Sequence, residues 1–430
     1  MRVSSSMIHD AGLAGISRQT AALLKVQQQL ASGRRILTPG DDPVAAARAL
    51  EVSQAKEIVT QYGENQKAAL GALGVEESHL AHAGDLLQRV RELAVQAGST
   101  SLTPTARKAI ATELRGTYEQ LLGIANSKDA AGNHLFGGYM SDTIPFAGSI
   151  DALAAGGEID YKGDQGQRLL QVSSSRYIEV SDSGIDVFRR IPSGNGWFAT
   201  DYNAANTGTA SIDAGSVSDP AAWRASAGDV EVRFSVSGGN TTYDLVDTAS
   251  GNSLLSGGAA PAPLGSQRAY LPGQRISLAS QGAEPAFDYG ASVTVSGTPA
   301  DGDRFTLAPS TPQSVFATVA KLVGALENGA TTPAADARYI ADIRAGISGI
   351  SQALDNVVRV RAQVGTRMTE IEALQTVGGD LSVQYQQTLS ELTDVDYAAA
   401  VTELTRRQAG LEAAQQSYLR VSQLSLFKFL

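Results

Sequence analysis

Hydrophobic positions repeat at helical spacing at both ends of the chain, and the first such repeat lies near the amino terminus. Its members stand seven residues apart, as along one stripe of a heptad: Ile16, Leu23, Leu30 and Leu37. Polar residues, Thr20 and Gln27, lie between them. A helix with so thin an apolar seam is marginal in isolation, so residues 1–38 are predicted to form a helix that needs a partner.

The carboxyl-terminal segment carries a matching stripe. Its members are Tyr397, Leu404, Leu411 and Tyr418. Gln408 and Gln415 lie in this seam, and polar seam residues lower stability but restrict register and partner choice. We predict that both stripes form an assembly interface. The terminal helices would pair within one subunit, pair fully only against neighbouring subunits, or do both.

A long helix is predicted behind the amino-terminal stripe. Asp42 can accept hydrogen bonds from the free amides of a first helical turn, and Pro43 suits the first helical position. From there to about Gly98 the chain is rich in Ala, Leu, Gln and Glu. A helix of roughly 55 residues is about 80 Å long, which is typical of a rod. Gly71 and Gly74 are weak points where it could be interrupted.

Two more pairs of a capping residue and a proline predict helix starts. Thr103-Pro104 begins a helix that runs to about Ser127, and Thr311-Pro312 begins the helical region that continues to the carboxyl terminus. Breaks in this last region are predicted from glycine, proline and capping residues at 329–333, 378–379 and 393–394.

The middle of the chain has a different pattern. From about 141 to 309, Gly, Ser, Thr, Asp and Pro are dense and short alternating runs appear, such as 168–172, 230–236 and 292–295. This pattern indicates an antiparallel β domain. The order of helices, strands and helices predicts an α+β multidomain protein, in which a long helical rod or coiled coil built from both termini carries an inserted antiparallel β-rich domain.

The predicted domains combine segments from both halves of the chain. A terminal-helix domain takes 1–40 and 393–430, a helical rod domain takes 41–145 and 311–392, and the β-rich domain takes 146–310.

Composition narrows the function. Net charge is −10, from 34 basic and 44 acidic residues, and no basic stripe supports nucleic-acid binding. The absence of cysteine excludes disulfides, thiolate metal sites and Cys nucleophiles. We find no cleavable signal peptide near the amino terminus and expect no membrane insertion.

Candidate chemical sites are weak. His79 and His82 stand three apart on a predicted helix, yet no catalytic or metal-ligand spacing surrounds them. Asp301-Gly302-Asp303 lacks the further ligands of a calcium loop and is predicted to be a turn. Capping accounts for Asp41-Asp42 without acid–base chemistry. We therefore expect no catalytic residue, no cofactor and no metal, and do not expect an enzyme.

Two segments resemble a known family. The run Leu30-Ala-Ser-Gly-Arg-Arg-Ile-Leu37, followed by Pro39-Gly-Asp-Asp-Pro-Val-Ala-Ala-Ala47, resembles the start of the flagellin superfamily, and Leu411-Glu-Ala-Ala-Gln-Gln-Ser-Tyr418 with Leu424–Leu430 resembles its end. Pro43-Val44-Ala45 replaces the usual flagellin Ala-Ala-Gly, and 297–305 resembles a segment of hook–filament junction proteins. The sequence is therefore more similar to that branch, hook-associated protein 3, than to filament flagellins.

The resemblance covers roughly 1–145 and 310–430. It implies that the terminal helices form an inner tube wall, that the β domain lies outside, and that the protein is extracellular after export through the flagellar type III channel. Implied partners are neighbouring hook-associated and flagellin subunits, further copies in a ring, an export chaperone and the export apparatus. Alternatives are a filament flagellin or, from another class, a secreted adhesin that binds through its β domain.

Overall fold

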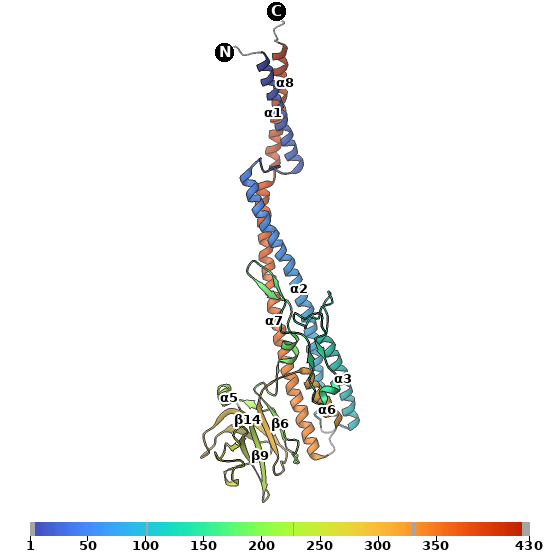
Figure 1. Cartoon of the computed structure of the whole chain (residues 1–430), viewed down its shortest axis with the longest axis vertical. Coiled ribbons are helices and arrows are strands. Elements are labelled where there is room, and N and C mark those ends of the chain that lie inside the picture. The colour runs from blue at the N-terminus through green and yellow to red at the C-terminus, as the bar shows by residue number, and fades with distance from the viewer. Residues whose placement is uncertain (1–4, 100–101, 227, 329–331, 424–430) are drawn as a thin grey trace, which may run out of the picture. The chain divides into compact units, whose positions relative to one another are not determined.

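The computed structural model describes residues 5–99, 102–226, 228–328 and 332–423. The chain forms two compact units. The first comprises 1–67, 172–175 and 372–430, and the second comprises 68–171 and 176–371. Figure 1 shows the elements of both. Long helices from both halves of the chain and a central antiparallel β domain confirm the predicted α+β class.

The first unit contains the paired terminal helices. Helix α1 spans Ser5–Ser32 and helix α8 spans Tyr397–Gln423, and the two lie side by side (Figure 1). Two backbone hydrogen bonds join the segment that follows α1 to the segment that precedes α8. The Arg35 amide donates to the carbonyl of Thr393 over 2.7 Å, and the Val395 amide donates to that of Gly33 over 2.9 Å. The prediction of a helix through residue 38 is wrong at its end, because α1 stops at Ser32 and Leu37 lies beyond it.

The two longest helices are α2, Pro43–Ala97, and α7, Pro333–Thr393. Within the first unit, a Cβ built on Gly378 would lie 3.9 Å from the side chain of Val59. Neither helix is interrupted at the predicted weak points. In α2 the helix continues through Gly71 and Gly74, and in α7 through Gly378 and Gly379. A helical glycine costs only about 1 kcal/mol relative to alanine, so helix on both sides overrides it.

The helical part of the second unit packs α3, Pro104–Ala125, and α6, Val315–Asn328, with the α2 and α7 segments of this unit (Figure 1). As predicted, Thr103 caps α3: its Oγ1 accepts from the amide of Ala106 over 3.2 Å. The core contains a ring cluster in which Phe316 lies 5.9 Å from Tyr118, 5.3 Å from Phe146 and 5.8 Å from Phe188, centroid to centroid.

Short elements connect α3 to the β domain. In order they are β1 (Phe146–Ala147), α4 (Ile150–Ala154), β2 (Asp160–Tyr161), β3 (Leu169–Gln171), β4 (Tyr177–Glu179), the π-helix η1 (Ile185–Arg189) and β5 (Ile191–Pro192). Strands β1 and β2 pair, as do β3 and β4, both antiparallel.

The β domain consists of two antiparallel sheets over one core. The larger sheet has the order β11-β10-β9-β15-β6 with β12 beside β10, and the smaller has β13-β14-β7 with β8 beside β14. The bounds are β6 Phe198–Tyr202, β7 Ser211–Ile212, β8 Ser216–Val217, α5 Pro220–Ser226, β9 Val230–Ser237, β10 Asn240–Asp247, β11 Asn252–Ser253, η2 Leu264–Ser266, β12 Arg268–Ala269, β13 Arg275–Ala279, β14 Asp288–Ser296 and β15 Arg304–Pro309.

The predicted helix start at Thr311-Pro312 is wrong. Pro312–Gln313 forms strand β16, which pairs with β5, and α6 begins only at Val315. Ser314 takes the capping role, since its Oγ accepts from the amide of Phe316 over 3.2 Å. A Thr-Pro pair meets the requirements of a strand end as well as those of a helix start, and pairing with β5 decides between them.

Candidate assembly interface of the terminal helices

Close contacts join the amino-terminal part of α1 to the carboxyl-terminal part of α8. The Tyr418 hydroxyl lies 3.1 Å from His9 Nδ1, and the two rings meet edge to face with centroids 5.5 Å apart. A Cβ on Gly12 would approach the Tyr418 ring to 2.7 Å. Gly12 therefore allows the aromatic ring to lie directly against the α1 backbone.

Six of the eight predicted interface residues are half-buried, and they lie on two helices that pack against each other: Ile16, Leu23, Leu30, Leu404, Leu411 and Tyr418. The other two are placed differently. Leu37 is half-buried beyond the end of α1, and Tyr397 at the start of α8 is 58 % exposed.

Sequence reasoning missed the most buried seam residue. Val26 is 9 % exposed, and across the parts of α1 and α8 whose side chains are described it alone is buried. It stands three residues after Leu23 and four before Leu30. A search for the mixed three-and-four spacing of a helical face, rather than for intervals of seven, would have found it.

Large apolar side chains on the outer faces of the pair lie in solvent. They are more than half exposed on both helices: Met7, Leu13, Leu24, Val401 and Leu419, with exposed fractions from 51 to 63 %. Contiguous exposed apolar surface on a monomeric protein marks contacts with other proteins, whereas single exposed apolar side chains are common. The pair thus has few buried side chains and exposes several large apolar ones.

A polar link follows α1 and leads into α2. The Asp41 carboxylate accepts from the amides of Leu37 and Thr38, at 3.0 and 2.9 Å, and contacts Lys25 Nζ at 2.6 Å. The hydrogen bond from Lys25, with those from the amides, holds the pKa of Asp41 far below its usual range.

At the next position, Asp42 occupies the cap of α2. Its Oδ1 accepts from the amide of Ala45 over 3.0 Å, and Pro43 is the first residue of the helix. This hydrogen bond from the Ala45 amide is the main cause that lowers the pKa of Asp42, and a hydrogen bond with Arg35 contributes less. Both neighbouring carboxylates therefore accept hydrogen bonds from backbone amides.

The second unit contains a buried charge cluster with no sequence signature. Arg367 of α7 donates to both oxygens of Asp182, at 2.9 and 3.0 Å, and the Asp182 amide donates to Glu76 Oε1 of α2 over 3.0 Å. Glu76 Oε2 is buried without a hydrogen-bond partner. Burial, followed by the charge of Asp182, raises the pKa of Glu76.

The other candidate sites have structural explanations. Burial and the charge of His82 lower the pKa of His79 on α2. Asp303 follows Gly302, whose φ is +83°, and its buried carboxylate accepts from the amides of Thr207, Gly208 and Ala300. Over the described ranges, no cluster of three or more His, Cys, Asp or Glu side chains could hold a metal. Among the helices there, none combines the length and apolarity that a bilayer crossing requires.

Comparison with known proteins agrees with this arrangement of helices. The bacterial flagellin N-terminal helical region matches residues 3–141, and the bacterial flagellin C-terminal helical region matches 347–430. The matched segments contain α1, α2, α3 and α8 and most of α7.

Two relatives that match over almost their whole length belong to one branch of the superfamily. Flagellar hook-associated protein 3 of Salmonella typhimurium is 24 % identical, with 100 % of this chain and 99 % of the relative covered. A crystal structure of flagellar hook-associated protein 3 from Legionella pneumophila is 31 % identical, with 79 % of this chain and 98 % of that chain covered at a TM-score of 0.70. Flagellin of Bacillus subtilis, at 29 % identity, aligns with only 33 % of this chain. The chain belongs to the flagellin superfamily and, within it, to the hook-associated protein 3 family.

Proposed function

We propose that this chain is a structural adaptor of the bacterial flagellum that joins the hook to the filament by polymerising through its terminal helices. The observation that carries the proposal is agreement along the whole chain with hook-associated protein 3, whereas the flagellin match is partial. A solved relative that is 31 % identical is described as a flagellar junction protein.

The terminal helix pair suits this task. Its seam contains half-buried apolar residues and one buried residue, Val26, while Leu13 and Leu24 on α1 and Val401 and Leu419 on α8 are exposed. Neighbouring subunits would cover these groups, and the polar seam positions would fix register. The stability missing from one pair is thereby supplied on assembly.

The proposed partners follow from the same role. They are neighbouring hook-associated and flagellin subunits, further copies in a ring, and, before assembly, an export chaperone and the flagellar export apparatus. The protein would be extracellular after export through the flagellar apparatus. It would bind no nucleic acid, insert into no membrane and catalyse no reaction.

Immunogold electron microscopy of intact flagella tests the proposal, with antibodies raised against the β domain, residues 193–311. We expect a single labelled band where filament meets hook. Label along the whole filament would instead identify a filament flagellin, and the absence of flagellar label would favour the adhesin. A strain that lacks the protein provides the background control.

A further inference from the structure

The β domain is joined to the helical part of its unit by one narrow connection. The chain enters through β5 and leaves through β16, and only Ile191–Gln313 and Pro192–Pro312 pair there. Proline has no amide hydrogen to donate, so the second pair cannot form a full set of ladder hydrogen bonds. Beyond it, the Ser193 amide donates a hydrogen bond to the carbonyl of Thr311, and the Thr311 amide donates one to Ser193 Oγ, each over 3.0 Å.

The domain has a core of its own. Phe198, Trp223, Phe234 and Phe305 are almost completely buried among residues of the same domain. The ring cluster around Phe316 forms a separate core in the helical part. Two independent cores on either side of a two-residue ladder are the arrangement of a body that can move as a unit.

Four hydrogen bonds, here termed the latch, hold the domain against α7. They are Tyr202 Oη to Asp342 Oδ2 at 3.1 Å, Arg338 Nη2 to the Asn206 carbonyl at 3.2 Å, Arg344 Nη1 to Ser211 Oγ at 3.1 Å, and Ser348 Oγ to the Gly194 carbonyl at 2.6 Å. Each of these groups can exchange its partner for water at a small net cost.

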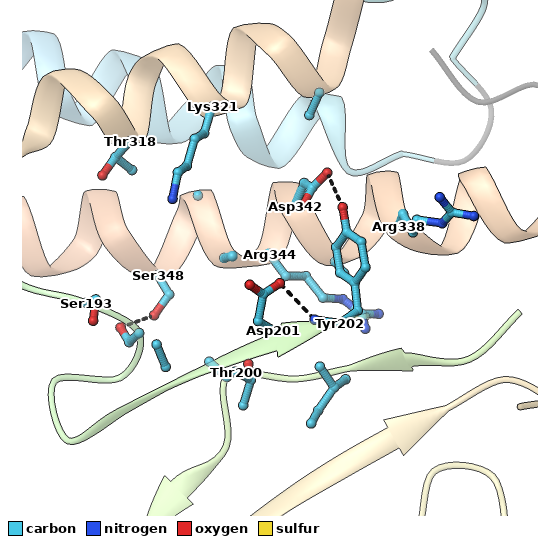
Figure 2. A pocket seen from close by; sticks show the side chains of 18 of the residues that line it. Ser193, Thr200, Asp201, Tyr202, Thr318, Lys321, Arg338, Asp342, Arg344 and Ser348 are labelled. Carbon is cyan, nitrogen blue, oxygen red and sulfur yellow. Dashed lines mark hydrogen bonds between the residues drawn. The ribbon is translucent and has the colours of Figure 1, made fainter. Parts of the chain in front are cut away.

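An open groove runs along the latch (Figure 2), with a cavity volume of about 740 Å³. Its sides come from β6, α6 and α7, and its lining includes Asp201, Lys321 and several alanines and glycines. Tyr202 reaches across it to Asp342, while Lys321 is exposed. Space and small side chains beside a polar contact leave room for the domain to change its angle to α7.

We propose that the β domain, residues 193–311, swings about the β5–β16 connection, and that the latch holds it against α7 in one of its positions. The helical part and the domain stay folded during this motion, because each retains its own core. The inference does not rest on the proposed junction role.

Electron–electron distance measurements on the full-length chain test this proposal. The chain contains no cysteine, so Asn240→Cys on the domain and Asp355→Cys on α7, both at exposed positions, can each carry one spin label. Removing two latch hydroxyls with Tyr202→Phe and Ser348→Ala should broaden the distance distribution and add a second, longer population.

The matched control is Tyr270→Phe, which removes a hydroxyl that bonds the carbonyls of Val295 and Gly297 inside the domain. It should leave the Asn240–Asp355 distribution unchanged. A second label pair within the domain, Asn240→Cys with Ser266→Cys, should stay narrow in the latch variant. Identical Asn240–Asp355 distributions with and without the latch would overturn the proposal, as would broadening of the pair within the domain.

Discussion

The terminal helices and the helical core of the second unit have the same secondary structure but differ in what surrounds them. Leu73, Leu80 and Leu87 of α2, all within the second unit, are at most 1 % exposed. By contrast, α1 and α8 have 28 and 27 residues, and Val26 is the one buried side chain among those described on them.

The difference shows that helix length does not indicate helix stability. Isolated helices are marginal in water, and most of their stability in proteins comes from packing an apolar face. The core helices obtain that packing within one chain. The terminal pair leaves several large apolar side chains exposed, and under the proposed function neighbouring subunits would pack against them.

The largest expected effect is at the ring cluster of the second unit. Phe316→Ala removes a fully buried ring that contacts those of Tyr118, Phe146 and Phe188. The free energy of unfolding of the main transition, measured by circular dichroism in denaturant, should fall by about 3–5 kcal/mol. The matched change in the terminal pair, Leu23→Ala, should leave this free energy of unfolding almost unchanged. Equal losses of unfolding free energy in the two variants would remove the contrast between the regions.

A smaller effect is expected at Glu76. Folding raises the pKa of this carboxyl, mainly through burial, so the folded state disfavours the ionised form. The protonated carboxyl of Glu76 makes its full contribution to the free energy of unfolding below the ordinary pKa of 4.5. This contribution is lost as the pH rises from 4.5 towards the raised pKa of the folded state. Glu76→Gln mimics the protonated form and should raise stability at neutral and alkaline pH by roughly 1–3 kcal/mol.

Thermal unfolding across a pH series measures this effect. The wild type should weaken as the pH rises, and Glu76→Gln should flatten that dependence. Glu92→Gln, an exposed change on the same helix, is the control. Parallel profiles for all three proteins would show that Glu76 is ionised without cost in the folded state.

A local effect is expected at the start of α2. Asp42→Ala removes the acceptor for the amide of Ala45, so amide exchange in the first turn of α2 should accelerate while the core of the second unit is unaffected. Asp42→Asn keeps a capping acceptor and should behave like the wild type. Unchanged exchange in the alanine variant would mean that the cap contributes nothing to this turn.

The smallest effect on the monomer, with the largest effect on assembly, is expected at Leu24. Its side chain is 52 % exposed on α1, so Leu24→Gln should change monomer unfolding by no more than about 0.5 kcal/mol. If neighbouring subunits cover this surface, the variant should fail to support filament attachment in a complementation assay. Thr60→Gln, an exposed change on α2, serves as the control, and normal attachment by Leu24→Gln would argue against the interface.

Local signals made much of the helical framework predictable. The α3 start rests on Thr103 and Pro104, which fix helix geometry within a single turn. Pairing of β16 with β5, a contact distant in sequence, overrode the helix signal at Thr311-Pro312. The break predicted at Gly378 is absent for a local reason, because the helix on both sides continues through it.

The candidate interface was predictable only in part, for similar reasons. Intervals of seven located half-buried positions such as Leu23 and Leu404 but passed over Val26. The Glu76–Asp182–Arg367 cluster joins three residues that are far apart in the sequence and follow no spacing rule. The latch was equally hidden, because it depends on how a separately folded domain rests on α7.

Amide hydrogen exchange of the full-length protein, in a confirmed monomer, tests the central claim most directly. Residues 5–32 and 397–423 should exchange fast, and residues 68–97 of α2 should be strongly protected, because only the latter have an apolar face that is fully buried within one chain. Slow exchange in both terminal helices, equal to that of the α2 core, would show that the pair is complete without neighbours and would contradict the account.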